Sequence, residues 1–270
     1  MPRSIWSGAI SFGLVNVPIK LFSAVSQKDV RFHQLDAKSK TRIRQKRVSA
    51  ETGEEVPYEN IIKGYEVAPD QFVAIEPQEL ESLDPKATKS IDIEDFVDLG
   101  QIDPIYYERP YYLIPDAGGA KAYALLVQSM KESGMVAIAR MVLRTKQYLV
   151  ALRAVDDAIV LETLYFHDEV IEPDELEGIP HDIEVSDREL KIARQLIESL
   201  ATEFEPERYE DEYRERVLDL IEKKAEGQEI VLQPQTEEPA QVVDLMAALE
   251  ASLAAVKDAK DEKPAPKKKK

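Results

Sequence analysis

Six positive charges lie within ten residues, Lys38 to Arg47 (KSKTRIRQKR), and no negative charge interrupts them. The whole chain of 270 residues has a formal net charge of −17, so in bulk it should repel polyanions. Charge is screened over roughly 8–10 Å at physiological salt, which lets a local cationic patch attract an anion even when the molecule does not. Because Lys and Arg are common partners of phosphate oxygens, we predict contact with a phosphate backbone at this block.

Charge alternates along the rest of the chain. Residues 120–153 hold six Lys and Arg against one Glu, and residues 257–270 hold seven Lys. Acidic stretches separate them, with 13 Asp and Glu in residues 66–116 and 19 in residues 162–215. This alternation favours a fold that turns two basic segments toward one anionic ligand. The alternative is a protein-binding scaffold whose basic segments are merely solvated, and retention on heparin at low salt would distinguish the two.

Residues for catalysis are scarce. The chain has no cysteine, which excludes disulfides, cysteine metal sites and a thiol nucleophile. The three histidines are not at metal-ligand spacing: His33, His167 and His181. Asp92, Glu94 and Asp95 could gather Mg²⁺, but a chain with 52 acidic residues produces such clusters by chance. We expect no catalytic centre, metal or cofactor. A lyase acting through a lysine Schiff base is the enzymatic alternative, which borohydride trapping would reveal.

The first half of the chain reads mainly as β-structure. We predict strands within residues 4–34, including the segment RFHQL, and a further strand at 42–48 (RIRQKRV). Side chains alternate along a strand, so Arg42, Arg44 and Lys46 would share one face. A turn is expected at residues 51–54.

The middle of the chain mixes both element types. Residues 104–115 (PIYYERPYYLIP) are typical of a strand, and residues 119–133 have the apolar spacing of a helix that Gly134 ends. Residues 136–166 read as a three-stranded meander, with Arg140 and Arg144 on the same strand face. Lys146 falls in the first turn of this meander.

The last third is predicted to be helical. Ser186 and Glu189 form a capping box, and a second helix follows Pro206 and ends at Gly227. Its expected inward residues are Tyr209, Tyr213, Val217, Leu220 and Ile221. Residues 228–239 read as a linker and 257–270 as a disordered Lys-rich tail. The helix between them, 240–256, is amphipathic and is predicted to dock a partner protein through Val242, Leu245, Met246, Leu249 and Leu253.

The order of β, mixed and α segments favours an α+β fold. No run of 18 apolar residues occurs, and the apolar start of the chain is interrupted by Pro18 and Lys20. We therefore expect a soluble cytoplasmic protein with no membrane partner.

A collinear series of segments resembles the bacterial Ku proteins, from about residue 3 to about residue 225. The segments that carry the resemblance are SIWSGAISFGLVNVPIKLFSA, RFHQL, RIRQKRV, EVPYENIIKGYE, ERPYYLIPD, YLVALR and PERYEDEYRERVLDLIEKKAEG. The resemblance implies a Ku core over residues 1–227, with a β-barrel, helical arm segments and C-terminal helices. It also implies a homodimeric ring that threads onto double-stranded DNA ends without reading sequence. Such a ring would protect and bridge ends and recruit an ATP-dependent DNA ligase, ligase D, in non-homologous end joining. The resemblance further implies association with the nucleoid and no small-molecule substrate.

The resemblance also assigns site residues. Candidate contacts to the DNA backbone are Arg31, Lys38, Lys40, Arg42, Arg44, Lys46, Arg47, Arg140, Arg144, Lys146, Lys267, Lys268, Lys269 and Lys270. These basic segments look poor in exposed aromatic residues, so we expect recognition of duplex shape and charge instead of base stacking.

Overall fold

The computed structural model describes residues 3–76, 78–79, 89–143, 146–180, 183–227 and 245–261. The chain divides into two compact units. The barrel unit comprises residues up to 28 together with 32–175, and the helical unit comprises residues 29–31 together with those from 176 onward.

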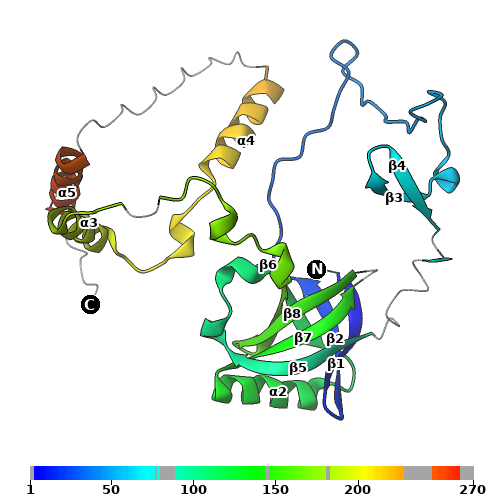
Figure 1. Ribbon diagram of the computed structural model, residues 1–270, viewed down its shortest axis with the longest axis horizontal. Helices are drawn as coiled ribbons and strands as arrows, with labels where there is room; N and C mark the ends of the chain where they lie inside the picture. The colour runs from blue at the N-terminus through cyan, green and yellow to red at the C-terminus, as the bar shows by residue number, and fades with distance from the viewer. Residues whose placement is uncertain are drawn as a thin grey trace. The chain divides into compact units, whose positions relative to one another are not determined.

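A closed β-barrel is the centre of the barrel unit (Figure 1). Its strands follow one another around the barrel in the order β1-β2-β6-β9-β8-β7-β5. Neighbouring strands are antiparallel except at the closure, where β1 and β5 are parallel through the pairs Ala9–Ser90 and Ile10–Ile91. The strands are β1 (Trp6–Phe12), β2 (Val15–Ser23), β5 (Ser90–Asp98), β6 (Tyr107–Pro115), β7 (Met135–Leu143), β8 (Lys146–Val155) and β9 (Ala158–Leu164).

Inward-facing apolar side chains fill the barrel. Alternation along each strand places branched residues inside, and eight of them are almost fully inaccessible to solvent: Ile10, Ile19, Leu21, Ile91, Leu113, Leu152, Ile159 and Leu161. Full burial of one such side chain contributes roughly 1.5–3 kcal/mol. The α+β class, the strand at 104–115 and the three-stranded meander are all confirmed.

Helix α2 (Ala120–Ser133) packs on the barrel and ends at Gly134, whose φ of 69° is left-handed. Its buried face consists of Tyr123, Leu126, Val127 and Met130. The Tyr123 hydroxyl donates to the carbonyl of Leu113 at 2.6 Å and accepts from the amide of Ile159 at 2.7 Å. Burial raises the pKa of Tyr123, so the hydroxyl keeps the proton that it donates. One side chain of α2 thus joins β6 to β9, and the predicted helix is confirmed.

The described part of the segment between β2 and β5 leaves the barrel and contains little regular structure. Within it β3 (Lys63–Ala68) and β4 (Gln71–Ile75) form a separate two-stranded ribbon. The predicted strands at RFHQL and at 42–48 are wrong, because only isolated bridges join Leu35 to Arg42 and Val48 to Glu55. No neighbouring strand among the described residues offers these segments a continuous ladder of hydrogen bonds.

Short 3-10 helices connect the larger elements: η1 (Tyr58–Asn60), η2 (Leu99–Gln101), η3 (Pro104–Tyr106), η4 (His167–Glu169), η5 (Pro173–Glu175) and η6 (Pro206–Arg208). The helices of the helical unit are α3 (Asp187–Leu200), α4 (Glu212–Ala225) and α5 (Leu245–Asp261). Among the residues that the structure describes, no helix is both long and apolar enough to cross a membrane.

The Ser186 capping box of α3 is confirmed, since the Ser186 hydroxyl accepts from the Glu189 amide and the Glu189 carboxylate accepts from the Ser186 amide. The inward face predicted after Pro206 is wrong for the single chain. Tyr209 and Tyr213 are 67% and 72% exposed, and neither α3 nor α4 contains a buried residue. These helices are amphipathic, but the described residues bury none of their side chains completely.

The Tyr123 hydrogen bonds can be tested by the change Tyr123→Phe. We expect the free energy of unfolding to fall by about 1–3 kcal/mol, because a buried carbonyl and a buried amide lose their partner. Urea unfolding would measure the loss, with an unchanged dependence on urea concentration. Tyr112→Phe is the control, since Tyr112 is 40% exposed and its hydroxyl has no partner among the described residues. An equal loss in both variants would contradict the interpretation.

Candidate nucleic-acid interface

Asp36 organises the start of the basic loop, which we define as residues 38–47. Its carboxylate accepts hydrogen bonds from the amides of Lys38 and Ser39 and from the Ser39 hydroxyl, at 3.1, 3.1 and 2.6 Å. The Ser39 hydroxyl, followed by the two amides, lowers the pKa of Asp36. The stabilisation that these hydrogen bonds give is therefore complete at pH values above the ordinary pKa of Asp. It is lost as the pH falls through the lowered pKa of Asp36 in the folded protein. The turn holds residues 32–35 beside residues 42–45.

The cations of the basic loop are exposed and mostly unpaired. Lys46 contacts Glu55 at 2.6 Å. Lys38, Lys40, Arg42 and Arg44 are exposed and have no carboxylate within 4.0 Å among the described residues. The loop thus offers several charges whose only competing partner is water.

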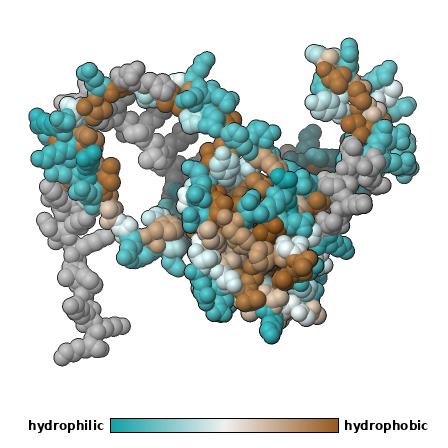
Figure 2. Space-filling model, turned by 60° about the horizontal axis from the view of Figure 1, so that its bottom comes forward, coloured by the Kyte–Doolittle hydropathy of each residue, from teal (hydrophilic) through white to brown (hydrophobic). Residues whose placement is uncertain are grey.

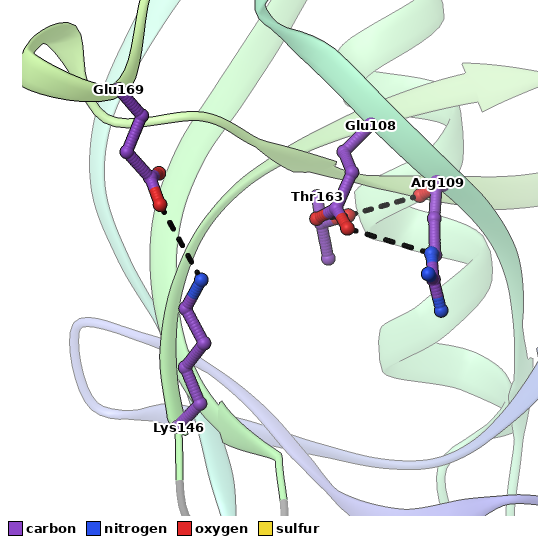
Figure 3. A network of polar contacts seen from close by, with 5 residues as sticks. All are labelled: Glu108, Arg109, Lys146, Thr163 and Glu169. Carbon is purple, nitrogen blue, oxygen red and sulfur yellow. Dashed lines mark hydrogen bonds and ion pairs between the residues drawn. The ribbon is translucent and has the colours of Figure 1, made fainter.

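Cations on the barrel are in a different situation, because carboxylates of the same unit neutralise them. Arg140 lies 3.6 Å from Glu94, and Lys146 lies 3.5 Å from Glu169, as Figure 3 shows for the second pair. The amide of Phe166 and then the charge of Lys146 lower the pKa of Glu169, so this carboxylate is ionised at neutral pH. Exposed ion pairs contribute only about 0–1 kcal/mol, so a phosphate could replace either carboxylate. Arg140 and Lys146 therefore stay predictions as backbone contacts.

Arg109 follows the same pattern. Its Nε atom lies 3.4 Å from Glu108, whose other oxygen accepts a hydrogen bond of 3.1 Å from the buried Thr163 (Figure 3). Further pairs on the barrel join Lys20 to Asp116, Lys131 to Asp157 and Arg153 to Glu162. Two of these pairs, Arg140–Glu94 and Arg153–Glu162, join side chains of neighbouring strands. The others involve α2, η4, a turn or adjacent residues. In every pair an acidic residue of the barrel unit compensates the cation, which a count of basic residues does not reveal.

Several predicted contacts cannot be placed in the same site. Arg31 is exposed but belongs to the helical unit, whereas the basic loop belongs to the barrel unit. Arg144 and the tail lysines, Lys267, Lys268, Lys269 and Lys270, lie outside the described residues.

The predicted partner-docking helix packs on another helix of its own unit. The described part of this helix, α5, contacts α3, and Arg188 joins Glu250 at 2.9 Å. Met246, Leu249 and Leu253 are partly buried. Val242, the linker at 228–239 and the side chain of Leu245 lie outside the description, so docking through these residues stays a prediction.

No metal-binding cluster of His, Asp or Glu occurs among the described residues. Glu94, one of the three acidic residues considered for Mg²⁺, pairs with Arg140 instead. His33 belongs to the walls of a shallow polar pocket at the basic loop.

The basic loop contains no aromatic residue of its own, but two exposed aromatic side chains lie beside it. Phe32 is 72% exposed beside the loop, and Tyr58 is 81% exposed with the Arg47 guanidinium 5.3 Å from its ring centroid. The sequence hides the second contact because the partners are eleven positions apart. The bridge between Val48 and Glu55 folds the intervening chain back and brings them together.

The chain matches the family model of the Ku70/Ku80 beta-barrel domain over residues 11–192, a span that contains the basic loop and most of the barrel. The non-homologous end joining protein Ku of Anaeromyxobacter sp. (strain K) is 51% identical over 267 residues, which cover 98% of this chain and 90% of that protein. Proteins of the same name from Heliobacterium modesticaldum and Archaeoglobus fulgidus are 45% and 42% identical, over 98% and 94% of this chain and 96% and 100% of their own lengths. The matched domain and the closed barrel agree, and the chain belongs to the Ku family.

Proposed function

We propose that this protein binds the ends of double-stranded DNA without reading their sequence and acts in non-homologous end joining. Relatives of nearly the same length are named non-homologous end joining protein Ku. We propose further that it acts as a homodimeric ring, that it is not an enzyme, and that it recruits and stimulates the ATP-dependent ligase D.

The observation that carries the proposal is the basic loop with its unpaired cations. Phosphate contacts by Lys and Arg position a protein on DNA without carrying sequence information. Arg42 and Arg44 can bind phosphates without first leaving a carboxylate, and the hydrogen bonds of Asp36 hold their segment in a defined turn. Such contacts depend strongly on salt because they release counterions from the DNA.

Exposed apolar surface supports the homodimer. A two-stranded ribbon is marginal on its own, yet β3 and β4 expose large side chains: Tyr65, Val67, Phe72 and Val73. Figure 2 shows apolar residues at the surface of this ribbon. The helical unit exposes others, among them Ile197, Leu200, Phe204, Tyr209 and Tyr213. Surface of this kind marks a protein interface, and a second copy is the occupant that the family resemblance implies.

The distribution of charge supports loading at an end. The chain carries 52 acidic residues against 35 Lys and Arg, so a duplex approaching most of its surface is repelled. If the unpaired cations line a closed opening, a duplex can reach them only by entering the opening from an end.

Competition between linear and closed DNA tests this proposal. We expect unlabelled linear duplex to displace a labelled linear duplex, while covalently closed circles of the same sequence do not, because circles have no end to enter. A gel-shift series at one fixed salt concentration measures both. Equal competition by circles would show side-on binding by charge and would exclude a ring loaded at ends.

Neutralising the basic loop tests its role. The double change Arg42→Gln and Arg44→Gln should weaken binding to linear duplex and lower the slope of log affinity against log salt by about 0.9 for each phosphate that the loop no longer neutralises. The control is the pair Arg214→Gln and Arg216→Gln in α4, which removes the same charge from the helical unit. An unchanged slope in the loop variant, or an equal fall in both, would remove the loop from the interface.

Deleting residues 228–270 tests the role of the C-terminal region. We expect dimerisation, measured by sedimentation, and DNA binding to persist while stimulation of ligase D falls, because α5 is absent. A shorter deletion, residues 262–270, removes the tail but keeps α5 and should retain more stimulation. Full stimulation by the longer deletion would refute the assignment of ligase recruitment to this region.

A further inference from the structure

A small pocket opens at the basic loop, and its walls combine an aromatic ring with a cation. The pocket has a volume of about 330 Å³ and is lined by Phe32, His33, Gln34, Arg42, Ile43 and Gln45. It exists because the Asp36 turn sets residues 32–35 beside residues 42–45, with the amide of Ile43 donating to the carbonyl of Gln34 at 3.2 Å. The two segments are held by the turn and isolated bonds instead of a continuous ladder, which leaves side chains around a hollow.

Phe32 lines the same pocket as a cation that has no partner. The ring is 72% exposed, and Arg42 has no carboxylate within 4.0 Å among the described residues. Arg and Phe are both common at protein interfaces, so the residue types alone do not identify the ligand. The six positive charges of the basic loop favour an anionic one. The exposed apolar residues of β3 and β4 suit a second copy, whereas an exposed ring beside an unpaired guanidinium suits a ligand with both a flat face and a negative charge.

A nucleotide has both features. Aromatic side chains stack with bases in proteins that bind single strands, while neighbouring cations hold the phosphates. Arg can pair with two phosphate oxygens at once. The side-chain amide groups of Gln34 and Gln45 each offer a hydrogen-bond donor and an acceptor to the edge of any base. They would therefore favour no single base sequence. A base inside a duplex is stacked on its neighbours, which restricts this contact to bases that are unpaired.

We propose that the Phe32 pocket binds an unpaired nucleotide of a single-stranded overhang at the DNA end, with the base on the Phe32 ring and its phosphate on Arg42. Tyr58, with Arg47 against its ring, is a second stacking position of the same kind. The inference rests on the proposed function and extends it, since the loop then distinguishes an end with an overhang from a blunt end.

Overhangs with and without bases provide the test. Three ligands share one duplex: a blunt end, an end with a short thymidine overhang, and an end whose overhang has abasic sugars and the same phosphates. The wild-type protein should bind the thymidine overhang about fivefold or more tightly than the abasic one, since each stacked base contributes about 1–3 kcal/mol. The change Phe32→Ala should abolish this preference and leave the affinity for the blunt end unchanged.

Two controls separate stacking from a general loss of structure. Tyr112→Ala removes an aromatic side chain of β6 that is 40% exposed, and it should keep the preference. Phe32→Tyr keeps a ring and should keep it as well. A 2-aminopurine base in the overhang should lose fluorescence on binding to the wild-type protein and not on binding to Phe32→Ala.

The outcomes are distinguishable. Equal wild-type affinity for the two overhangs overturns the stacking proposal and leaves duplex end binding intact. A loss of blunt-end affinity in Phe32→Ala that equals the loss for overhangs also overturns it, because the ring then supports the loop and not a base. Failure of the wild-type protein to bind the blunt end contradicts the proposed function itself, whatever the overhangs do.

Discussion

The parallel pairing of β1 with β5 is the constraint on which the rest of the barrel unit depends. Residues some 80 positions apart must meet for the barrel to close, and β2 is already fixed beside β1 by its hairpin. The chain between Ser23 and Ser90 therefore leaves from one strand of the closed barrel and returns to another. We call this connecting segment, residues 24–89, the excursion. The basic loop and the β3–β4 ribbon lie in it, so both are attached to the barrel at two ends although they contribute no residue to its core.

The structure distinguishes two kinds of basic residue that a count of Lys and Arg cannot tell apart: cations paired with a carboxylate and cations without such a partner. On the barrel, antiparallel strands pair Arg140 with Glu94 and Arg153 with Glu162, and η4 brings Glu169 beside Lys146, so the positive charge is compensated within the fold. In the excursion no such neighbours surround Arg42 and Arg44 among the described residues, and the charge stays available. A strongly acidic protein can in this way keep a local affinity for polyanions, because its acidic residues pair with the cations of the barrel and, in the loop, Lys46 alone has such a partner among the described residues.

Local signals in the sequence predicted much of the fold. Gly134 and the apolar spacing before it located α2, and the Ser186 capping box located α3, because both depend on residues within a few positions of each other. The strand expected at 42–48 failed because a strand needs a partner, and residue types do not tell whether one is present. The inward face expected for the helix after Pro206 was misassigned for the same reason. The contact of Arg47 with Tyr58 depends on a fold-back of the chain that charge counting cannot detect.

The Tyr123 hydroxyl has a consequence for how the barrel unit opens. Because this one group bonds a carbonyl of β6 and an amide of β9, α2 cannot leave the barrel without exposing both strands to water. The helix and the β6–β9 pair then form one cooperative unit. Their amide hydrogens should exchange with solvent at a common slow rate, while those of the excursion, with few protected bonds, exchange at once.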